Sequence, residues 1–345
     1  MKESIAAGLL LTVLLFTMSW LHAIPETKTE PPREEALAVQ ETAVASVETQ
    51  SVETQSVQQT ENLLKDSDIE LRVKLNGGVQ HITMAEYLPC VIRGEMPPDF
   101  DLEALKAQAA AERTYILYQM EKGAKVTHPE ADVCDDPSCC SAYLSEDDAR
   151  KRWGDRFAEW EEKIQTAVRE TDGAIMRYDG EPIMAVFHSS SAGTTAACGD
   201  VWMADLPYLV SVESPETADS VPNYYSVKTV SRDEFCRIFK SKYPAADFSG
   251  AWVAGRTENS SGRVESLTIG GVTVSGGDVR SLYGLRSTCF TVEVGDAVTF
   301  HVTGYGHGVG MSQYGAEELA KQGKNWQEIL QWYYKDISID GYTSR

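Results

Sequence analysis

The chain has 345 residues, of which 42% are hydrophobic, and a formal net charge of −21 at pH 7. This length and apolar content are enough for one large domain or two modest ones. The negative charge argues against nucleic acid or an anionic membrane surface as the main partner, because both require basic patches on the protein.

An apolar run covers residues 5–24, with Lys2 on its N-terminal side. It has about the ~20 residues that a membrane-spanning helix needs. A cleavable signal peptide is the alternative, but the run is longer than the apolar part of most signal peptides and no clear cleavage site follows it. We therefore predict a transmembrane signal anchor at residues 1–24, with the rest of the chain outside the cytoplasm.

Residues 25–66 are rich in Glu, Gln, Thr and Ser and contain the repeated pentad SVETQ. Such a segment buries too little apolar surface to offset the entropy lost on ordering. We predict a disordered acidic spacer here, followed by the functional domain at residues 67–345.

The ordered region begins with apolar and polar residues in alternation at 69–75, then a turn, which predicts a β-hairpin into 79–83. Thr83 and Glu86 have the spacing of a capping box and predict a short helix, which Pro89 should kink or shorten. The next helix is expected over 101–120 because it is rich in strong helix formers. Helices and strands then follow without strict alternation, which indicates an α+β fold of mixed helices and mainly antiparallel sheet, with a possible smaller α/β lobe at about 216–300.

Glu95 lies at a corner between a helix and a loop, directly before Met96, Pro97 and Pro98. A carboxyl at the mouth of a cleft and shielded by apolar neighbours can have a raised pKa and act as a general acid. The alternative is a surface glutamate that caps the next helix. On the helix that follows, Lys106 and Arg113 are seven residues apart and are expected to share a face that could point into a cleft.

Two further segments could carry chemistry. His188 and Ser189 precede a Ser/Gly turn, and we expect this stretch to form a cleft wall because the pattern of a serine nucleophile is absent. Four glycines surround Tyr305 and His307, which permits positive φ angles and close approach of the backbone to a ligand.

Together, these three segments resemble the stage II sporulation protein D family over residues 69–337. The resemblance rests on the blocks EYLPCVIRGEMP, LKAQAAAERTY and GYGHGVGMSQYGA. It implies a lytic transglycosylase that acts on peptidoglycan glycan strands during engulfment, from the mother-cell membrane facing the forespore. It makes Glu95 catalytic and gives a set of cleft-lining candidates: Lys106, Gln108, Arg113, His188, Ser189, His307, Ser312 and Gln313.

The resemblance also suggests a sporulation amidase and a membrane scaffold protein as partners. Relatives described as amidase enhancers leave a second hypothesis open, a glycan-binding activator without catalysis. The reaction implied for the enzyme needs one carboxyl, since the sugar's own 6-hydroxyl attacks C1 to give a 1,6-anhydro end. We find no second acid near Glu95 in the sequence and expect no organic cofactor.

His128, Cys134 and Cys140 have a spacing compatible with tetrahedral zinc, and Cys139 is adjacent. Some relatives carry a similar His-Cys-Cys set, which favours Zn²⁺ with a mainly structural role. The alternatives are a disulfide between Cys134 and Cys139 or Cys140, free thiols, and a zinc enzyme, for which the usual HExxH motif is missing. The four scattered cysteines are expected to act as small hydrophobic residues.

Overall fold

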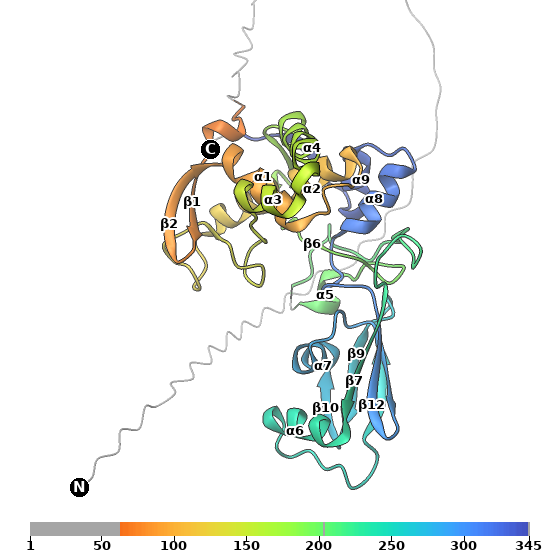
Figure 1. Ribbon diagram of the computed structural model, residues 1–345. Helices are drawn as coiled ribbons and strands as arrows, with labels where there is room; N and C mark the ends of the chain where they lie inside the picture. The colour runs from red at the N-terminus through yellow and green to blue at the C-terminus, as the bar shows by residue number, and fades with distance from the viewer. Residues whose placement is uncertain (1–62, 203, 344–345) are drawn as a thin grey trace, which may run out of the picture. The chain divides into compact units, whose positions relative to one another are not determined.

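The computed structural model describes residues 63–202 and 204–343, which form an α+β fold with mostly antiparallel sheets (Figure 1). The predicted anchor, and the predicted spacer up to residue 62, lie outside the described residues. Within the described ranges, no helix is long and apolar enough to cross a membrane.

A three-stranded sheet begins the described part of the chain after a short 3-10 helix, η1. The predicted hairpin is confirmed: β1 and β2 pair in antiparallel register, and β3 adds to β1 in parallel. Leu71 and Val73 are fully buried, while most of β2 is exposed. The bounds are η1 (Asp66–Asp68), β1 (Glu70–Leu75), β2 (Gly78–Thr83) and β3 (Val133–Cys134).

Helix α1 (Met84–Glu95) carries the candidate acid at its last residue. The predicted capping box is present: Thr83 Oγ1 accepts from the Glu86 amide at 3.3 Å, and Glu86 Oε2 accepts from the Thr83 amide at 2.7 Å. Pro89 lies inside the helix and does not shorten it, since the helix continues to Glu95. Pro89 is buried, and its packing outweighs the one backbone hydrogen bond that proline removes.

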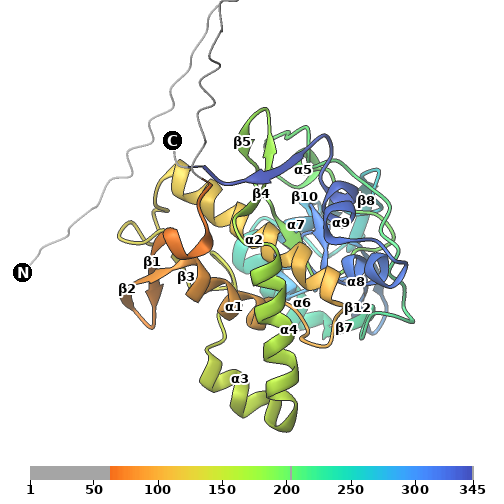
Figure 2. The same ribbon diagram turned by 90° about the horizontal axis from the view of Figure 1, so that it is seen from above.

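Helix α2 packs against α1, α4, α8, α9 and β4 (Figure 2). Its alanines at 104, 107 and 109–111 are fully buried, so neighbouring elements approach the helix on several sides. The bounds of this helical part are α2 (Leu102–Lys122), α3 (Glu146–Trp153), η2 (Gly154–Arg156), α4 (Phe157–Glu170), α8 (Gln313–Lys321) and α9 (Trp326–Tyr333).

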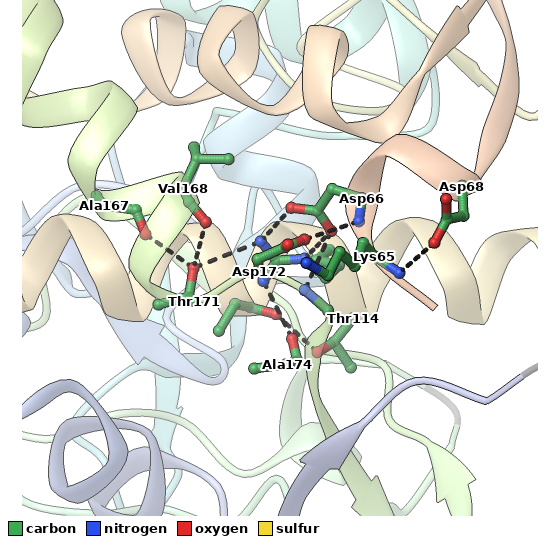
Figure 3. Close-up of polar contacts among 12 residues, drawn as sticks. Lys65, Asp66, Asp68, Thr114, Ala167, Val168, Thr171, Asp172 and Ala174 are labelled. Carbon is green, nitrogen blue, oxygen red and sulfur yellow. Dashed lines mark hydrogen bonds and ion pairs between the residues drawn. The ribbon is translucent and has the colours of Figure 1, made fainter. Parts of the chain in front are cut away.

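The predicted end of the spacer at residue 66 is wrong, because residues 63–66 are part of the folded domain. Leu64 donates its amide to the Tyr342 carbonyl at 2.7 Å. Asp66 is only 2% exposed and bonds Arg113 through both carboxylate oxygens, at 2.6 and 2.7 Å. Figure 3 shows Asp66 among Thr114, Thr171, Asp172 and Ala174, where its amide donates to Asp172 at 2.8 Å.

A second hydrophobic cluster, built by residues between Val230 and Val302, is separate from the first. Its range lies close to the smaller lobe expected at about 216–300. Aromatic side chains dominate it, with Phe235 stacked on Tyr283 at 4.9 Å between ring centres. Two antiparallel sheets and two helices form this lobe (Figure 1): β7 (Tyr225–Ser231), α6 (Arg232–Lys242), β8 (Val253–Glu258), β9 (Val264–Ile269), β10 (Val272–Ser275), α7 (Gly276–Tyr283), β11 (Phe290–Val294) and β12 (Ala297–Thr303).

Short strands connect segments that are far apart in the sequence. The parallel pair β6 and β13 joins Phe187 to Met311 and His188 to Ser312. The serine-rich and glycine-rich segments are therefore neighbours in the fold. The remaining elements are β4 (Ala174–Tyr178), β5 (Glu181–Pro182), β6 (Phe187–His188), α5 (Cys198–Val201), β13 (Met311–Ser312) and β14 (Ser338–Gly341).

Candidate functional site

A cleft of 590 Å³ is lined by residues from several separate stretches of the chain. The end of α1, the loop after the cysteines, strand β6, the glycine-rich segment and helix α7 all contribute. Its lining includes Glu95, Tyr115, Ser141, His188, Ser189, Trp202, Arg280, Tyr305, His307 and Gln313.

Glu95 is held at the cleft by the loop that follows the cysteines. Its carboxylate accepts a hydrogen bond from the Ala142 amide. The loop comes so close that a side chain at Gly94 would meet the Ala142 carbonyl oxygen at 2.4 Å, so only glycine fits there. The alternative of a surface glutamate that caps the next helix is excluded, because Asp101 makes that cap.

The pKa of Glu95 is raised above its ordinary value by burial, while the Ala142 amide and the Gln313 side chain oppose the rise. Desolvation disfavours the charged carboxylate, so the proton is held to a higher pH than on an exposed glutamate. This is the property that a general acid needs near neutral pH.

The glycine-rich segment has positive φ at all four glycines 304, 306, 308 and 310. Its close approach is to the chain itself rather than to a free ligand. At Gly306, with φ of +116°, a side chain would meet His188 Cβ at 2.7 Å. Tyr305 and Ser190 exchange backbone hydrogen bonds at 2.9 and 3.0 Å. The two motifs therefore form one wall of the cleft.

His188 and His307 are neutral hydrogen-bonding groups in this wall. Burial lowers the pKa of His188 well below its ordinary value and lowers the pKa of His307 to about 4. The His307 ring packs beside that of Trp202, with ring centres 5.0 Å apart. Neither imidazole is charged at neutral pH, so both act as neutral groups in the wall of the cleft.

The serines are split between the cleft and the interior. Ser189 lines the cleft, whereas Ser191 is fully buried and bonds His188 Nε2 at 2.9 Å. Ser312 is also fully buried and caps α8 while it donates to Glu216 at 2.6 Å. Ser312 therefore supports the wall from behind and does not line the cleft, contrary to the sequence prediction.

Lys106, Gln108 and Arg113 do not line the cleft, although the sequence placed them there. Lys106 bonds Glu103 and Glu170, both at 2.6 Å, and thereby ties α2 to α4. Arg113 is fully buried against Asp66. Gln108 is buried as well and donates to Glu112 at 3.4 Å. The helix is enclosed by other elements, so its polar residues meet protein partners there.

The predicted metal ligands come together, and Cys139 joins them. The ligand atoms of His128, Cys134, Cys139 and Cys140 all lie within 4.8 Å of one another. His128 Nδ1 bonds the Ala131 carbonyl at 3.0 Å, which leaves Nε2, 3.4 Å from Cys140 Sγ, facing the thiols. One imidazole and three thiols are a tetrahedral donor set that suits zinc.

The charge around this cluster also fits a zinc ion. Three thiolates and Zn²⁺ carry a net charge of −1, and the Lys125 ammonium lies 3.4 Å from Cys140 Sγ, where it offsets that charge. All seven cysteines are free thiols in the structure, so the alternative disulfide is not formed. Cys139 is therefore placed to serve as the fourth ligand that the sequence left open.

Three residues of functional interest were missed in the sequence. Arg280 brings a cation to the cleft from α7, and Trp202 brings an exposed aromatic ring. Glu112 is a fully buried second carboxyl on α2, and Glu95 contributes to the rise in its pKa. In the sequence, Glu112 could have been identified as a charged residue within the alanine-rich stretch of α2.

Comparison with known proteins agrees with this arrangement. The family described as "Stage II sporulation protein" matches residues 75–178, which include Glu95, α2 and the cysteine loop. Stage II sporulation protein D of Bacillus subtilis (strain 168) is 37% identical over 279 residues, which cover 80% of each chain. The chain belongs to the stage II sporulation protein D family.

Other relatives extend this assignment of the family. Stage II sporulation protein D of Bacillus amyloliquefaciens is 36% identical and covers 83% of each chain. An amidase enhancer of Bacillus subtilis (strain 168) is 27% identical, over 73% of this chain and 40% of the enhancer. Membership of the sporulation family is thereby confirmed.

Proposed function

We propose that this protein is a lytic transglycosylase that cleaves peptidoglycan glycan strands next to N-acetylmuramic acid during engulfment in endospore formation. The main support is the position of Glu95, a partly desolvated carboxyl with a raised pKa, at the edge of a 590 Å³ cleft. The cleft has the aromatic ring and neutral hydrogen-bonding groups that suit a sugar chain.

The reaction requires Glu95 to donate one proton and then to accept one. Protonated Glu95 donates to the glycosidic oxygen as its bond to C1 of N-acetylmuramic acid breaks. The resulting carboxylate then accepts the proton of the same sugar's 6-hydroxyl, as O6 bonds to C1 and a 1,6-anhydro ring forms. Water is neither consumed nor released, so the site needs no residue to activate it.

His128, Cys134, Cys139 and Cys140 would hold Zn²⁺, which closes the loop that continues into Ser141 and Ala142. A site with four protein ligands has no open position for substrate or water. The bound ion would therefore act as a structural cross-link that presents the Ala142 amide to Glu95.

We place the functional domain outside the cytoplasm, held to the membrane through residues 1–24. A sporulation amidase and a membrane scaffold protein are the proposed partners. A glycan-binding enhancer of an amidase is the second candidate, and the likeness to the amidase enhancer is the observation that favours it.

Digestion of purified glycan strands with the full-length chain, followed by mass spectrometry of the products, distinguishes these functions. We expect new 1,6-anhydro ends. Reducing ends would identify a hydrolase and overturn the proposal. Strands that are bound but not cut would support the enhancer.

A further inference from the structure

The loop after the cysteines holds two carboxyls with two adjacent residues. Ala142 donates its amide to Glu95, and Ser141 Oγ donates to Glu112 Oε2 at 3.0 Å. Gln108 Nε2 lies 3.4 Å from the other oxygen of Glu112. Glu112 is fully buried and is not part of the cleft lining. Glu95, which lines the cleft, is therefore linked through this loop to a buried carboxyl on α2, Glu112.

The surroundings of Glu112 disfavour its charged form. Burial raises its pKa to about 8, with a further contribution from the charge of Glu95, whereas Ser141 and Gln108 lower it. The other titratable groups near it are Tyr87 on α1, Tyr115 on α2 and Tyr334 after α9, all with raised pKa values and therefore neutral. Glu95 is the neighbouring carboxyl whose charge raises the pKa of Glu112.

We propose that Glu95 and Glu112 work as a pair that retains one proton through neutral pH, with Glu112 as the positioning residue that never contacts the glycan. This inference deepens the proposed function and rests on it. Two carboxyls that share a desolvated site resist double ionisation, so they titrate as a pair rather than singly.

The pairing changes how activity depends on pH. While the pair holds one proton, a fixed fraction of molecules carries it on Glu95, and this fraction does not vary with pH. The acid form therefore persists until the pair loses its last proton, which happens at a higher pH than the ionisation of Glu95 alone. Without Glu112, the acid form would fall about tenfold per pH unit once the pH exceeds the pKa of Glu95 alone.

A second carboxyl also invites the reading of a glycosidase with an acid and a nucleophile. The burial of Glu112 excludes it as the nucleophile, since a nucleophile must touch the sugar. The 1,6-anhydro product is therefore still expected. The second acid is distant from Glu95 in the sequence and is brought to it only by the fold.

The test compares the rate of anhydro-end formation between pH 5 and 9 for the wild type and Glu112→Gln, both full length. We expect the rate of the wild type to decline at a higher pH than the rate of the variant. Glu121→Gln, an exposed position on the same helix, should follow the wild type. A uniform loss of rate with an unchanged pH profile would overturn the pairing.

Ser141→Ala provides a second variant with the opposite sign. Because the Ser141 hydroxyl lowers the pKa of Glu112, its removal should move the upper limit of activity to higher pH. A shift in the same direction as that of Glu112→Gln, or no shift, would contradict the proposal.

Urea unfolding tests the pair without any enzymatic readout. A failure of the pairing can therefore be distinguished from a failure of the proposed function. A carboxyl whose pKa is raised on folding stabilises the protein fully below its unfolded pKa, and this contribution is lost as pH rises to about 8. The wild type should therefore lose stability between pH 5 and 8, and Glu112→Gln should lose less. Equal slopes would contradict the pairing even if no glycan is cleaved.

Discussion

The Glu95 carboxyl is placed between opposing influences, and the balance sets its chemistry. Burial favours the protonated acid, while the Ala142 amide favours the carboxylate that must form after proton donation. A residue that donates and then recovers one proton benefits from support in both states. The motif in the sequence identified this residue, but its partners come from residues 112, 142 and 313, which only the fold brings near.

Arg280 gives a prediction about substrate binding. It lines the cleft, and its Nε donates to the Leu285 carbonyl at 3.3 Å, so the guanidinium retains donors for an anion. The carboxylate of muramic acid suits it. We expect Arg280→Gln to raise KM about tenfold with little change in kcat, because a hydrogen bond to a charged group is worth about 1.5–3 kcal/mol.

Steady-state assays on glycan strands measure this effect. Arg237→Gln on α6 is the matched control, since that side chain is exposed and lies in the same lobe. An unchanged KM for Arg280→Gln would remove Arg280 from the binding site.

At the scale of elements, helix α2 explains why some sequence predictions failed. Its composition correctly indicated a long helix, but helical spacing alone made Lys106 and Arg113 neighbours on a face that could have opened into a cleft. The structure encloses that face with η1, α4 and β4. Which elements cover a helix is decided by contacts between distant residues, and spacing along the helix does not report them.

Arg113 therefore yields a prediction about stability. Arg113→Met leaves the buried Asp66 carboxylate without its cation, which should cost about 3–5 kcal/mol in the free energy of unfolding. Urea denaturation measures this loss, and the exposed Arg169→Met should change it by less than about 0.5 kcal/mol. A raised KM with unchanged stability would instead return Arg113 to the substrate site.

The cysteine loop predicts a joint effect of metal removal on folding and activity. A chelator should lower the melting temperature and the cleavage rate together, because the ligands and the residues that hold both carboxyls are consecutive. Cys140→Ser should reproduce both losses, and Cys236→Ser, in the other lobe, should reproduce neither. Loss of activity with an unchanged melting curve would argue against a structural role for the metal.

At the scale of the whole molecule, the cleft draws on both hydrophobic clusters. Glu95 and Gln313 come from helices of the first, and Arg280 comes from α7 of the second. The class of fold and the place of Glu95 at a cleft could be predicted because they depend on local patterns and long motifs. The approach of α7 to Glu95 could not, since it depends on how the two clusters pack.

The net charge of −21 also acquires a meaning at this scale. An acidic surface disfavours polyanions in general, so an anionic glycan must be accepted through local cations. Arg280 supplies such a cation inside the cleft. The acidic surface thus disfavours most anions, whereas Arg280 can bind an anionic group that enters the cleft.

The most direct test of the central claim is the comparison of wild type with Glu95→Gln on purified glycan strands, by mass spectrometry and co-sedimentation. We predict that the variant still binds the strands but forms 1,6-anhydro ends about 10²–10⁴-fold more slowly, since the amide has no proton to donate. Glu121→Gln should cleave as the wild type does. Cleavage by Glu95→Gln at the wild-type rate would contradict the account.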